Sequence, residues 1–230
     1  MELAAQGATL ALSARRKDKL DAIIEKLEGQ GHLALPANAA DPASLVDVLA
    51  KISETFPHLD SAVFMAAIYG PHDGKPKPLP FIHEMIAVNL GGAFNMIDAV
   101  LPRYEQQNFG QIALCASIAG YRGLPTGQPY CATKAALINL AESLKVDLEP
   151  KNIDVKVINP GFVKTPLTDK NNFHMPMMIE ASEAATAIAK GLRSKKFEIH
   201  FPKKFTLLMK LLRIMPNGLY FSIARRIRPK

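Results

Sequence analysis

The segment CASIAGYRGLPTGQPYCATK, residues 115–134, brings together three side chains that could handle a proton. Tyr130 and Lys134 are spaced i and i+4, so they project from the same face of one helix. A phenol can donate a proton to a bound oxygen atom, although its ordinary pKa is about 10. A nearby ammonium favours the phenolate, so Lys134 is expected to lower the pKa of Tyr130. Ser117 stands ahead of the pair and adds a hydroxyl that can form hydrogen bonds.

The Tyr-x-x-x-Lys pair is weak evidence when taken alone, because two surface residues of an amphipathic helix can have the same spacing. Its context is more specific. Ser117 ends an apolar run that is typical of a buried strand, and ligands bind outside the carboxyl ends of strands in open α/β sheets. Tyr130 opens the following helix, and small neighbours allow close approach to the pair: Ala132, Thr133, Ala135 and Ala136.

Alternating apolar runs and helical patterns define the frame that must position these residues. Continuous runs rich in Val, Ile, Ala and Leu predict strands near 8–14, 32–37, 61–67, 111–117, 154–159 and 197–201. Helices fit between them at about 16–28, 42–55, 80–107, 130–149 and 182–193, and Asp41-Pro42 is a typical helix start. This alternation predicts an α/β fold with a doubly wound parallel sheet and helices on both faces.

The charge is unevenly distributed along the chain. The 230 residues carry a net charge of +7, but residues 203–230 hold eight Lys or Arg residues and no Asp or Glu. The rest of the chain is near neutral, which excludes a nucleic-acid footprint over the whole domain. The chain has no run of eighteen apolar residues and no visible secretory signal, so no spanning helix is predicted. Cys115 and Cys131 lie in apolar segments and the histidines lack metal-ligand spacing, which favours a reduced, cytoplasmic protein without a metal.

Several motifs occur together along the chain. They are Asn89 in AVNLGGAFN, Ser117, the Tyr130-x-x-x-Lys134 motif, and NPGFVKTP with Pro160, Gly161, Val163 and Thr165. With these motifs the chain resembles the classical short-chain dehydrogenase/reductase family over essentially its whole length. The resemblance implies a Rossmann-like fold, a nicotinamide dinucleotide cofactor, and interconversion of a hydroxyl and a carbonyl on a small molecule. It also implies a homodimer or homotetramer.

The resemblance also assigns roles to four candidate catalytic residues. Tyr130 would be the general acid/base for the substrate oxygen, Ser117 would hold that oxygen by a hydrogen bond, and Lys134 would lower the pKa of the phenol. Asn89 resembles the family residue that links the Lys, through water, to bulk proton supply. The alternative for Asn89 is an Asn inside a helix that bonds its own backbone.

Cofactor choice is expected to depend on the end of the strand near 8–14. An acidic residue there binds the ribose hydroxyl of NAD, whereas arginine accommodates the extra phosphate of NADP. The strand ends in Arg15 and Arg16 with no carboxylate before Asp18, which favours NADP(H), with Arg15 the stronger candidate. An ordinary basic first turn of the next helix is the alternative. The other candidate cofactor-binding residues are Asn38, Ala66, Ala67, Tyr130, Lys134, Pro160, Gly161, Val163 and Thr165.

The chain departs from the family pattern at two positions of the cofactor site, and a third departure lies at the start of the chain. Met65-Ala66-Ala67 replaces Asn-Ala-Gly, and Asn38 stands where the family has an Asp near the adenine. The opening MELAAQG matches the end of the helix that follows the family's first strand and glycine-rich turn. The strand expected between 8–14 and 61–67 is therefore missing, which leaves two strand edges unpaired. Either the sequence starts at an internal methionine with about twenty residues lost, which we favour, or a short form has a phosphate site that is absent or rebuilt.

The C-terminal segment is predicted to be a unit of its own, with a Rossmann-like domain at 1–202 and a basic amphipathic tail at 203–230. Leucines at helical spacing predict one helix before Pro216, and a second helix is expected after it. Residues 205–230 could lie as a peripheral segment on an anionic membrane surface. The alternative is a C-terminal helix that packs on the domain edge and covers the substrate entrance.

Residues 163–181 form a long irregular insert that carries Met175, Met177 and Met178, where the family has its substrate lid. A Met-rich lid favours an apolar substrate, although ordinary packing of a loose loop explains the methionines equally well. The sequence as a whole predicts an NADP-dependent short-chain oxidoreductase. The runner-up is a non-catalytic, membrane-peripheral scaffold of the same fold that does not bind a dinucleotide.

Overall fold

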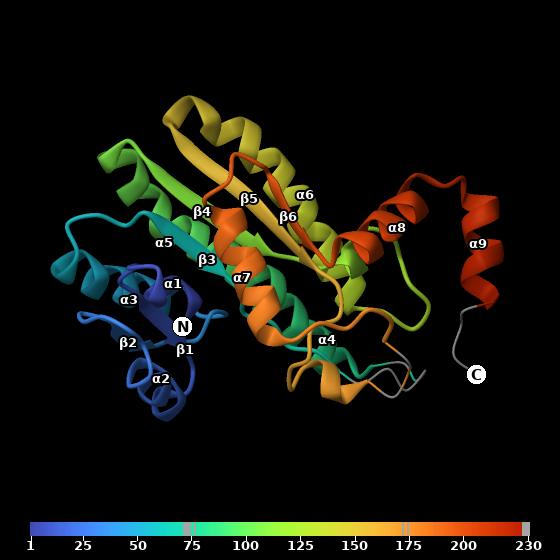
Figure 1. Ribbon diagram of the computed structural model, residues 1–230, viewed down its shortest axis with the longest axis horizontal. Helices are drawn as coiled ribbons and strands as arrows, with labels where there is room; N and C mark the ends of the chain where they lie inside the picture. The colour runs from blue at the N-terminus through green and yellow to red at the C-terminus, as the bar shows by residue number, and fades with distance from the viewer. Residues whose placement is uncertain (71–74, 76, 172, 174, 227–230) are drawn as a thin grey trace.

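Parallel strands with helices packed against them form the frame of the molecule (Figure 1). The computed structural model describes residues 1–70, 75, 77–171, 173 and 175–226. One parallel sheet contains, in order, β3 (Ser61–Phe64), β4 (Gly110–Cys115), β5 (Ile153–Pro160) and β6 (Glu198–Phe201). A separate parallel pair contains β1 (Ala11–Ala14) and β2 (Leu33–Pro36). The predicted α/β fold with parallel strands is confirmed.

The sheet is divided between β1 and β3. Within the described ranges, no hydrogen-bonded ladder joins these two strands: β1 pairs with β2, and β3 pairs with β4. This division is what a sheet without a strand between β1 and β3 requires. The expectation that further residues precede Met1 in a longer protein stays a prediction.

The four-stranded sheet is buried on both faces. Successive side chains of a strand point to opposite faces, so Ile112 and Leu114 of β4 join a larger core with α5 and α6, whereas Ala113 joins a smaller core with α7. In β5, Val157 faces the larger core and Ile158 the smaller one. Each of these five side chains is at most 1% exposed. Burial on both faces explains why the apolar runs are continuous rather than alternating.

The helices lie at the positions that the sequence predicts. They are α1 (Glu2–Ala5), α2 (Lys17–Ile24), α3 (Pro42–Thr55), α4 (Leu79–Ile86), α5 (Gly92–Gln107), α6 (Tyr130–Leu148), α7 (Ala181–Leu192), α8 (Lys203–Ile214) and α9 (Asn217–Arg226). Asp41 caps α3 by accepting a hydrogen bond from the Ala43 N–H at 3.1 Å. Gly7 follows α1 with a φ of 85°, the left-handed conformation of a C-terminal cap. Both helix-end signals are confirmed.

Some expected bounds are wrong. The strand near 61–67 ends at Phe64, because its last pair with β4 joins Phe64 to Leu114. The strand near 8–14 begins only at Ala11, where pairing with β2 begins, and the helix expected to reach residue 28 ends at Ile24. In the predicted loop 69–80 and insert 163–181, residues 71–74, 76, 172 and 174 lie outside the described residues.

The long helix expected at 80–107 is interrupted by a wider turn. A π-helical segment, η1 (Ala87–Gly91), separates α4 from α5. Gly92 opens α5 in close contact with another segment, because a Cβ there would lie 3.0 Å from the Ala39 Cβ. A hydrophobic period of 3.6 residues cannot reveal one extra residue in a turn, so the sequence pattern missed this interruption.

The same helical stretch passes a length and composition test for a membrane span, although it contains no run of eighteen apolar residues. Residues 79–107 form a helix long and apolar enough, by length and composition, to cross a membrane, although only 33% of its most apolar window is buried. Its α5 part contributes Ala93, Ile97, Val100 and Tyr104 to the larger core. We therefore interpret it as a core helix of the α/β fold, which passes the same length and composition test.

A partly buried polar cluster joins β6 to α8 and to the loop after Ser117. The Glu198 carboxylate accepts hydrogen bonds from the Tyr121 hydroxyl, the Asn159 side-chain amide and the Lys210 ammonium. Burial by itself would raise the pKa of Glu198, but the three donors together hold this pKa below its ordinary value. The cluster therefore stabilises the folded chain through a carboxylate that stays charged.

We expect the stability that Glu198 contributes to be lost in acid. Its pKa is lower in the folded than in the unfolded chain, so the contribution is present above the ordinary pKa of about 4.3 and disappears as the pH falls through the lower folded value. Glu198→Gln should lower the free energy of unfolding at pH 7 by about 1–3 kcal/mol and should flatten its decline in acid. Chemical denaturation at a series of pH values measures both effects. The exposed Glu25→Gln is the control, and a decline for Glu198→Gln as steep as that of the control would contradict the prediction.

Candidate active site

Ser117 lies two residues beyond the carboxyl end of β4. Its backbone is extended, and its side-chain Oγ accepts a hydrogen bond from the Ala119 N–H at 3.1 Å. This bond caps a short 3₁₀ turn, η2 (Ile118–Gly120), and fixes the direction in which the chain leaves the strand. The hydroxyl is therefore held at the sheet edge where ligands bind in open α/β folds.

Tyr130 and Lys134 lie on the first turn of α6, against the same strand end. The Lys134 Nζ lies 5.5 Å from the centroid of the Tyr130 ring and donates a hydrogen bond to the Cys115 carbonyl at 2.8 Å. Lys134 is only 2% exposed, so its ammonium depends on such partners. The structure thus brings Ser117, Tyr130 and Lys134 together around the end of β4.

The pKa of Tyr130 moves in the opposite direction to the one expected. Burial is the largest cause and raises it above the ordinary value, the thiols of Cys115 and Cys131 raise it further, and a hydrogen bond from Ser117 acts against them. Burial likewise lowers the pKa of Lys134. Sequence spacing correctly placed the ammonium near the phenol, but it could not show that burial raises the pKa of the phenol. A phenol in this environment keeps its proton at neutral pH and can donate it.

A second tyrosine, which the sequence analysis did not single out, contacts the first. The rings of Tyr69 and Tyr130 meet edge to face with centroids 5.0 Å apart. The Tyr69 hydroxyl donates a hydrogen bond to the Asn171 Oδ1 at 2.6 Å, and burial raises the pKa of Tyr69 to about 12. Tyr69 therefore joins the loop after β3 to the insert after β5 beside the candidate proton donor. No motif marks it in the sequence, because its neighbours read as an ordinary Pro/Gly loop.

Asn89 does not bond the backbone of its own helix, which was the alternative considered for it. Its Oδ1 accepts a hydrogen bond from the Ile68 N–H at 2.7 Å, and its Nδ2 donates to the Ile68 carbonyl at 3.0 Å and to the Thr133 Oγ1 at 3.4 Å. The bonds therefore go to another segment and not to the helix that carries Asn89. Asn89 fixes the chain next to Tyr69 and contacts α6 one residue before Lys134. A link to Lys134 through water stays a prediction.

The candidate residues for the nicotinamide side of a cofactor follow the carboxyl ends of β3 and β5. Ala66 and Ala67 lie beyond β3, and Pro160 and Gly161 lie at the end of β5. Carboxyl ends of parallel strands share one edge of a sheet, so these segments flank Ser117. At Gly161 a Cβ would lie 3.1 Å from the Phe205 ring, which shows that the chain passes very close to α8 there.

The insert after β5 is folded back on itself. The Thr168 hydroxyl donates to the Val163 carbonyl at 2.7 Å and accepts from the Thr165 N–H at 3.0 Å. A parallel bridge joins Val163 to Ile179 and closes the insert. These bonds hold Val163 and Thr165 in a defined turn after Gly161. Met177 and Met178 are 52% and 40% exposed, and Met175 contacts the Asn171 amide at 3.3 Å.

Arg15, Arg16 and Asn38 lie on the β1–β2 pair rather than on the four-stranded sheet. Both arginines are exposed after the end of β1, and Arg16 occupies the cap position of α2. Asn38 is exposed after β2, where its Oδ1 accepts a hydrogen bond from the Ala40 N–H at 3.2 Å. Two exposed guanidinium groups at a strand end fit the phosphate-bearing end of a dinucleotide. Within the part of the chain that the structure describes, no group of three metal-ligating side chains is present.

The chain also matches known proteins along most of its length. A family model described as short chain dehydrogenase matches residues 1–175. An uncharacterized oxidoreductase of Myxococcus xanthus is 33% identical over 230 residues, which cover 98% of this chain and 90% of the relative. A 3-oxoacyl-(acyl-carrier-protein) reductase of Staphylococcus aureus is 30% identical over 172 residues, which cover 74% of this chain and 70% of the relative.

Solved structures agree with this assignment at the level of the fold. A 3-ketoacyl-ACP reductase from Sinorhizobium meliloti superposes with a TM-score of 0.75 at 24% identity, covering 90% of this chain and 92% of that one. An alcohol dehydrogenase from Thermococcus sibiricus, solved with 5-hydroxy-NADP, has a TM-score of 0.72 at 23% identity, covering 87% and 88%. Because the family model spans 175 of the 230 residues, the chain belongs to the short-chain dehydrogenase/reductase family of oxidoreductases.

Proposed function

We propose that this protein is an NADP-dependent oxidoreductase that interconverts a hydroxyl and a carbonyl on an apolar small molecule. NAD(P)-dependent chemistry of this type is the family's activity, and the substrate and the preference for NADP are our proposals. The convergence of Ser117, Tyr130 and Lys134 at the end of β4 carries the proposal. A phenol and an ammonium buried together at a ligand-binding edge favour a role in proton transfer over a plain scaffold.

The three side chains divide the proton chemistry between them. The Ser117 hydroxyl donates a hydrogen bond to the substrate oxygen and orients it. The Tyr130 hydroxyl gives its proton to that oxygen during carbonyl reduction and takes it back during alcohol oxidation. The Lys134 ammonium stabilises the phenolate that remains after the proton has left. When bound, the cofactor supplies or accepts the hydride.

The cofactor would be held at two places on this chain. Ala66, Ala67, Pro160, Gly161, Val163 and Thr165 would line the end that reacts, together with Tyr130 and Lys134. Arg15 and Arg16 would bind the extra phosphate of NADP at the other end, with Asn38 near the adenine. Their exposure at the end of β1, without a carboxylate beside them, supports the choice of NADP.

The cofactor proposal predicts selective binding of NADPH. The protein has no tryptophan, so the fluorescence of the reduced cofactor itself can follow a titration with NADPH and with NADH. Arg15→Ala should weaken NADPH binding by about tenfold or more and leave NADH binding unchanged, because it removes only the phosphate contact. Lys19→Ala, an exposed cation on α2, is the control. Equal affinities of the wild-type chain for the two cofactors would contradict the choice of NADP.

We further propose that the protein works as a homodimer or homotetramer in the cytoplasm. Exposed apolar side chains on α5 and α6, Phe94 at 51% and Val146 at 70%, support self-association through these helices. The free thiols Cys115 and Cys131 are compatible with a reducing compartment. We also propose a peripheral membrane contact through residues 205–230.

A non-catalytic scaffold of the same fold is the second candidate. The gap between β1 and β3 favours it, because a dinucleotide pyrophosphate ordinarily sits on a glycine-rich turn that follows a strand at that place. The titration above separates the two candidates. NADPH-selective binding would support the enzyme. Failure to bind either cofactor would support the scaffold only if the chain extended upstream in frame also fails to bind.

A further inference from the structure

The two C-terminal helices expose an unusual amount of apolar surface. In Figure 1, α8 and α9 stand at the end of the molecule opposite the β1–β2 pair. Six of their large apolar side chains are 49–78% exposed, and we call them the docking face: Leu207, Leu208, Leu211, Ile214, Leu219 and Phe221. Large exposed apolar surfaces on a folded domain mark an interaction site.

The docking face is not the face that holds the helices to the domain. In α8, Phe205 and Met209 belong to the larger core, whereas Leu207, Leu211 and Ile214 repeat on another side of the helix at i, i+4 and i+7. In α9, Tyr220 and Ala224 are buried while Leu219 and Phe221 are exposed. α8 is therefore apolar on the side that packs and on a side that does not, whereas in α9 the exposed Leu219 and Phe221 lie on the two flanks of the buried Tyr220.

The charge around the docking face has a single sign. Residues 203–230 contain no Asp or Glu. Lys203, Lys204, Arg225 and Arg226 are exposed at the ends of α8 and α9. Lys210 is paired with Glu198 and Arg213 with Glu142, so these two cations are partly neutralised by acidic groups of the domain.

Exposed apolar side chains together with exposed cations favour one kind of binding partner for the docking face. A second copy of the chain on the same face would bring the exposed cations of two molecules together, which opposes association. A bilayer with anionic headgroups offers the opposite charge and accepts leucine and phenylalanine side chains below the headgroups. We propose that the docking face binds the surface of an anionic lipid bilayer, with its apolar side chains inserted and its cations against the lipid phosphates and carboxylates.

Hydrogen bonds and a cation–π contact fasten α8 and α9 to the domain. Arg122 donates hydrogen bonds to the Arg213 carbonyl at 2.9 Å and the Met215 carbonyl at 3.1 Å, and its guanidinium lies 4.4 Å from the centroid of the Tyr220 ring. The Tyr220 hydroxyl in turn donates to the Gly123 carbonyl. Arg122 and Gly123 belong to the loop between Ser117 and Tyr130, so the proposed lipid-binding helices are fastened to the loop that spans the candidate active site.

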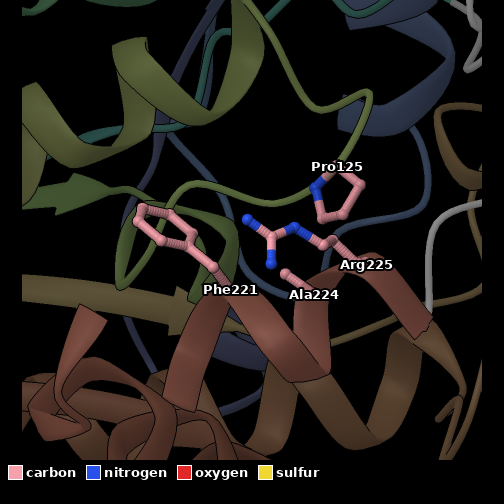
Figure 2. Close-up of a pocket in the computed structure, with 4 residues that line it drawn as sticks. All are labelled: Pro125, Phe221, Ala224 and Arg225. Atoms are coloured by element: carbon pink, nitrogen blue, oxygen red, sulfur yellow. The ribbon is translucent and has the colours of Figure 1, made fainter. Parts of the chain in front are cut away.

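The contact between α9 and this loop leaves a shallow pocket. Figure 2 shows Pro125 of the loop beside Phe221, Ala224 and Arg225 of α9. Phe221 therefore belongs both to the docking face and to the pocket wall. An apolar side chain and a guanidinium side by side at this surface fit an acyl chain next to its anionic headgroup.

Co-sedimentation of the full chain with lipid vesicles tests the proposal directly, without any dependence on enzyme activity. The probes are vesicles of phosphatidylcholine alone and vesicles with about one third phosphatidylserine. We expect binding to the anionic vesicles only, and weaker binding as salt is raised. The double variant Leu207→Gln/Leu211→Gln should lower the partition coefficient by about tenfold or more. Lys204→Gln/Arg226→Gln should lower it as well.

The matched control is Ile23→Gln/Val46→Gln, which removes two exposed apolar side chains of α2 and α3. The control should bind anionic vesicles as the unmodified chain does, and thermal melts of all variants should coincide. No binding to anionic vesicles, or equal loss in the control and the Leu207/Leu211 variant, would overturn the proposal. So would size-exclusion chromatography in which the Leu207/Leu211 variant dissociates an oligomer while its vesicle binding stays unchanged, because the face would then join two copies.

Discussion

Tyr130→Phe is expected to lower kcat by about 10²–10⁴-fold while NADPH affinity stays unchanged. The change removes the Tyr130 hydroxyl, which is the group that transfers a proton to the substrate oxygen in the proposed mechanism. Ser117 only donates a hydrogen bond to that oxygen. The ring remains, so its edge-to-face contact with Tyr69 is preserved. Steady-state turnover with a panel of apolar aldehydes, ketones and alcohols measures kcat, and cofactor fluorescence measures NADPH binding.

Comparison with Tyr69→Phe shows which of the two tyrosines donates the proton. Tyr69→Phe also removes a phenol hydroxyl from the same site, in this case one that donates a hydrogen bond to Asn171. The centroids of the Tyr69 and Tyr130 rings are 5.0 Å apart. We expect Tyr69→Phe to act mainly on KM, because Asn171 belongs to the insert after β5 and the proton donor is left in place. Turnover that survives in Tyr130→Phe but disappears in Tyr69→Phe would move the donor to Tyr69 and refute our assignment.

Gly120→Ala is expected to displace the residues of the candidate site, although Gly120 is not one of them. A Cβ at residue 120 would lie 2.7 Å from the carbonyl carbon and oxygen of Lys134 and 2.8 Å from the Ala135 nitrogen. These are backbone atoms of α6, so the turn after Ser117 and the helix must move apart. We expect a loss of about 1–3 kcal/mol in the free energy of unfolding. A loss of kcat should accompany it, because Ser117 and Lys134 lie on the two segments that separate.

Gly123→Ala provides the control from the same loop. No heavy atom lies within 4 Å of the Cβ that it would add, so stability and turnover should stay close to those of the unmodified chain. Denaturant unfolding curves and steady-state kinetics measure the two variants side by side. Equal behaviour of Gly120→Ala and Gly123→Ala would mean that the close packing of η2 on α6 does not position the catalytic groups.

Local patterns were sufficient to predict the frame of the molecule. Continuous apolar runs predicted the strands because the four-stranded sheet is buried on both faces, and the cap at Asp41 uses neighbouring residues alone. Local sequence was also sufficient to predict that Ser117, Tyr130 and Lys134 lie close together. The end of β4 and the start of α6 follow each other within one short segment, so the sequence order already determines which of their side chains can meet.

Features that depend on contacts between distant segments were not predictable. Asn89 bonds the backbone of Ile68, and Tyr69 bonds Asn171 across 102 positions of the sequence. The raised pKa of Tyr130 depends on how much protein surrounds the phenol, which no spacing of residues expresses. The π-helical turn at η1 adds one residue per turn without changing which residue types are apolar. Each of these depends on tertiary packing rather than on local sequence.

The division of the sheet gives the two ends of the cofactor site unequal resistance to local unfolding. β4 has a hydrogen-bonded neighbour on both sides, whereas within the described residues β1 pairs with β2 only. Opening β1, β2 and α2 therefore breaks a single strand ladder and leaves the four-stranded sheet intact, which is a low-energy route to exposing amide protons. Arg15, Arg16 and Asn38 belong to this less protected unit. A dinucleotide that binds them must also supply the free energy to keep the unit closed, so its affinity and the local stability of β1–β2 are linked quantities.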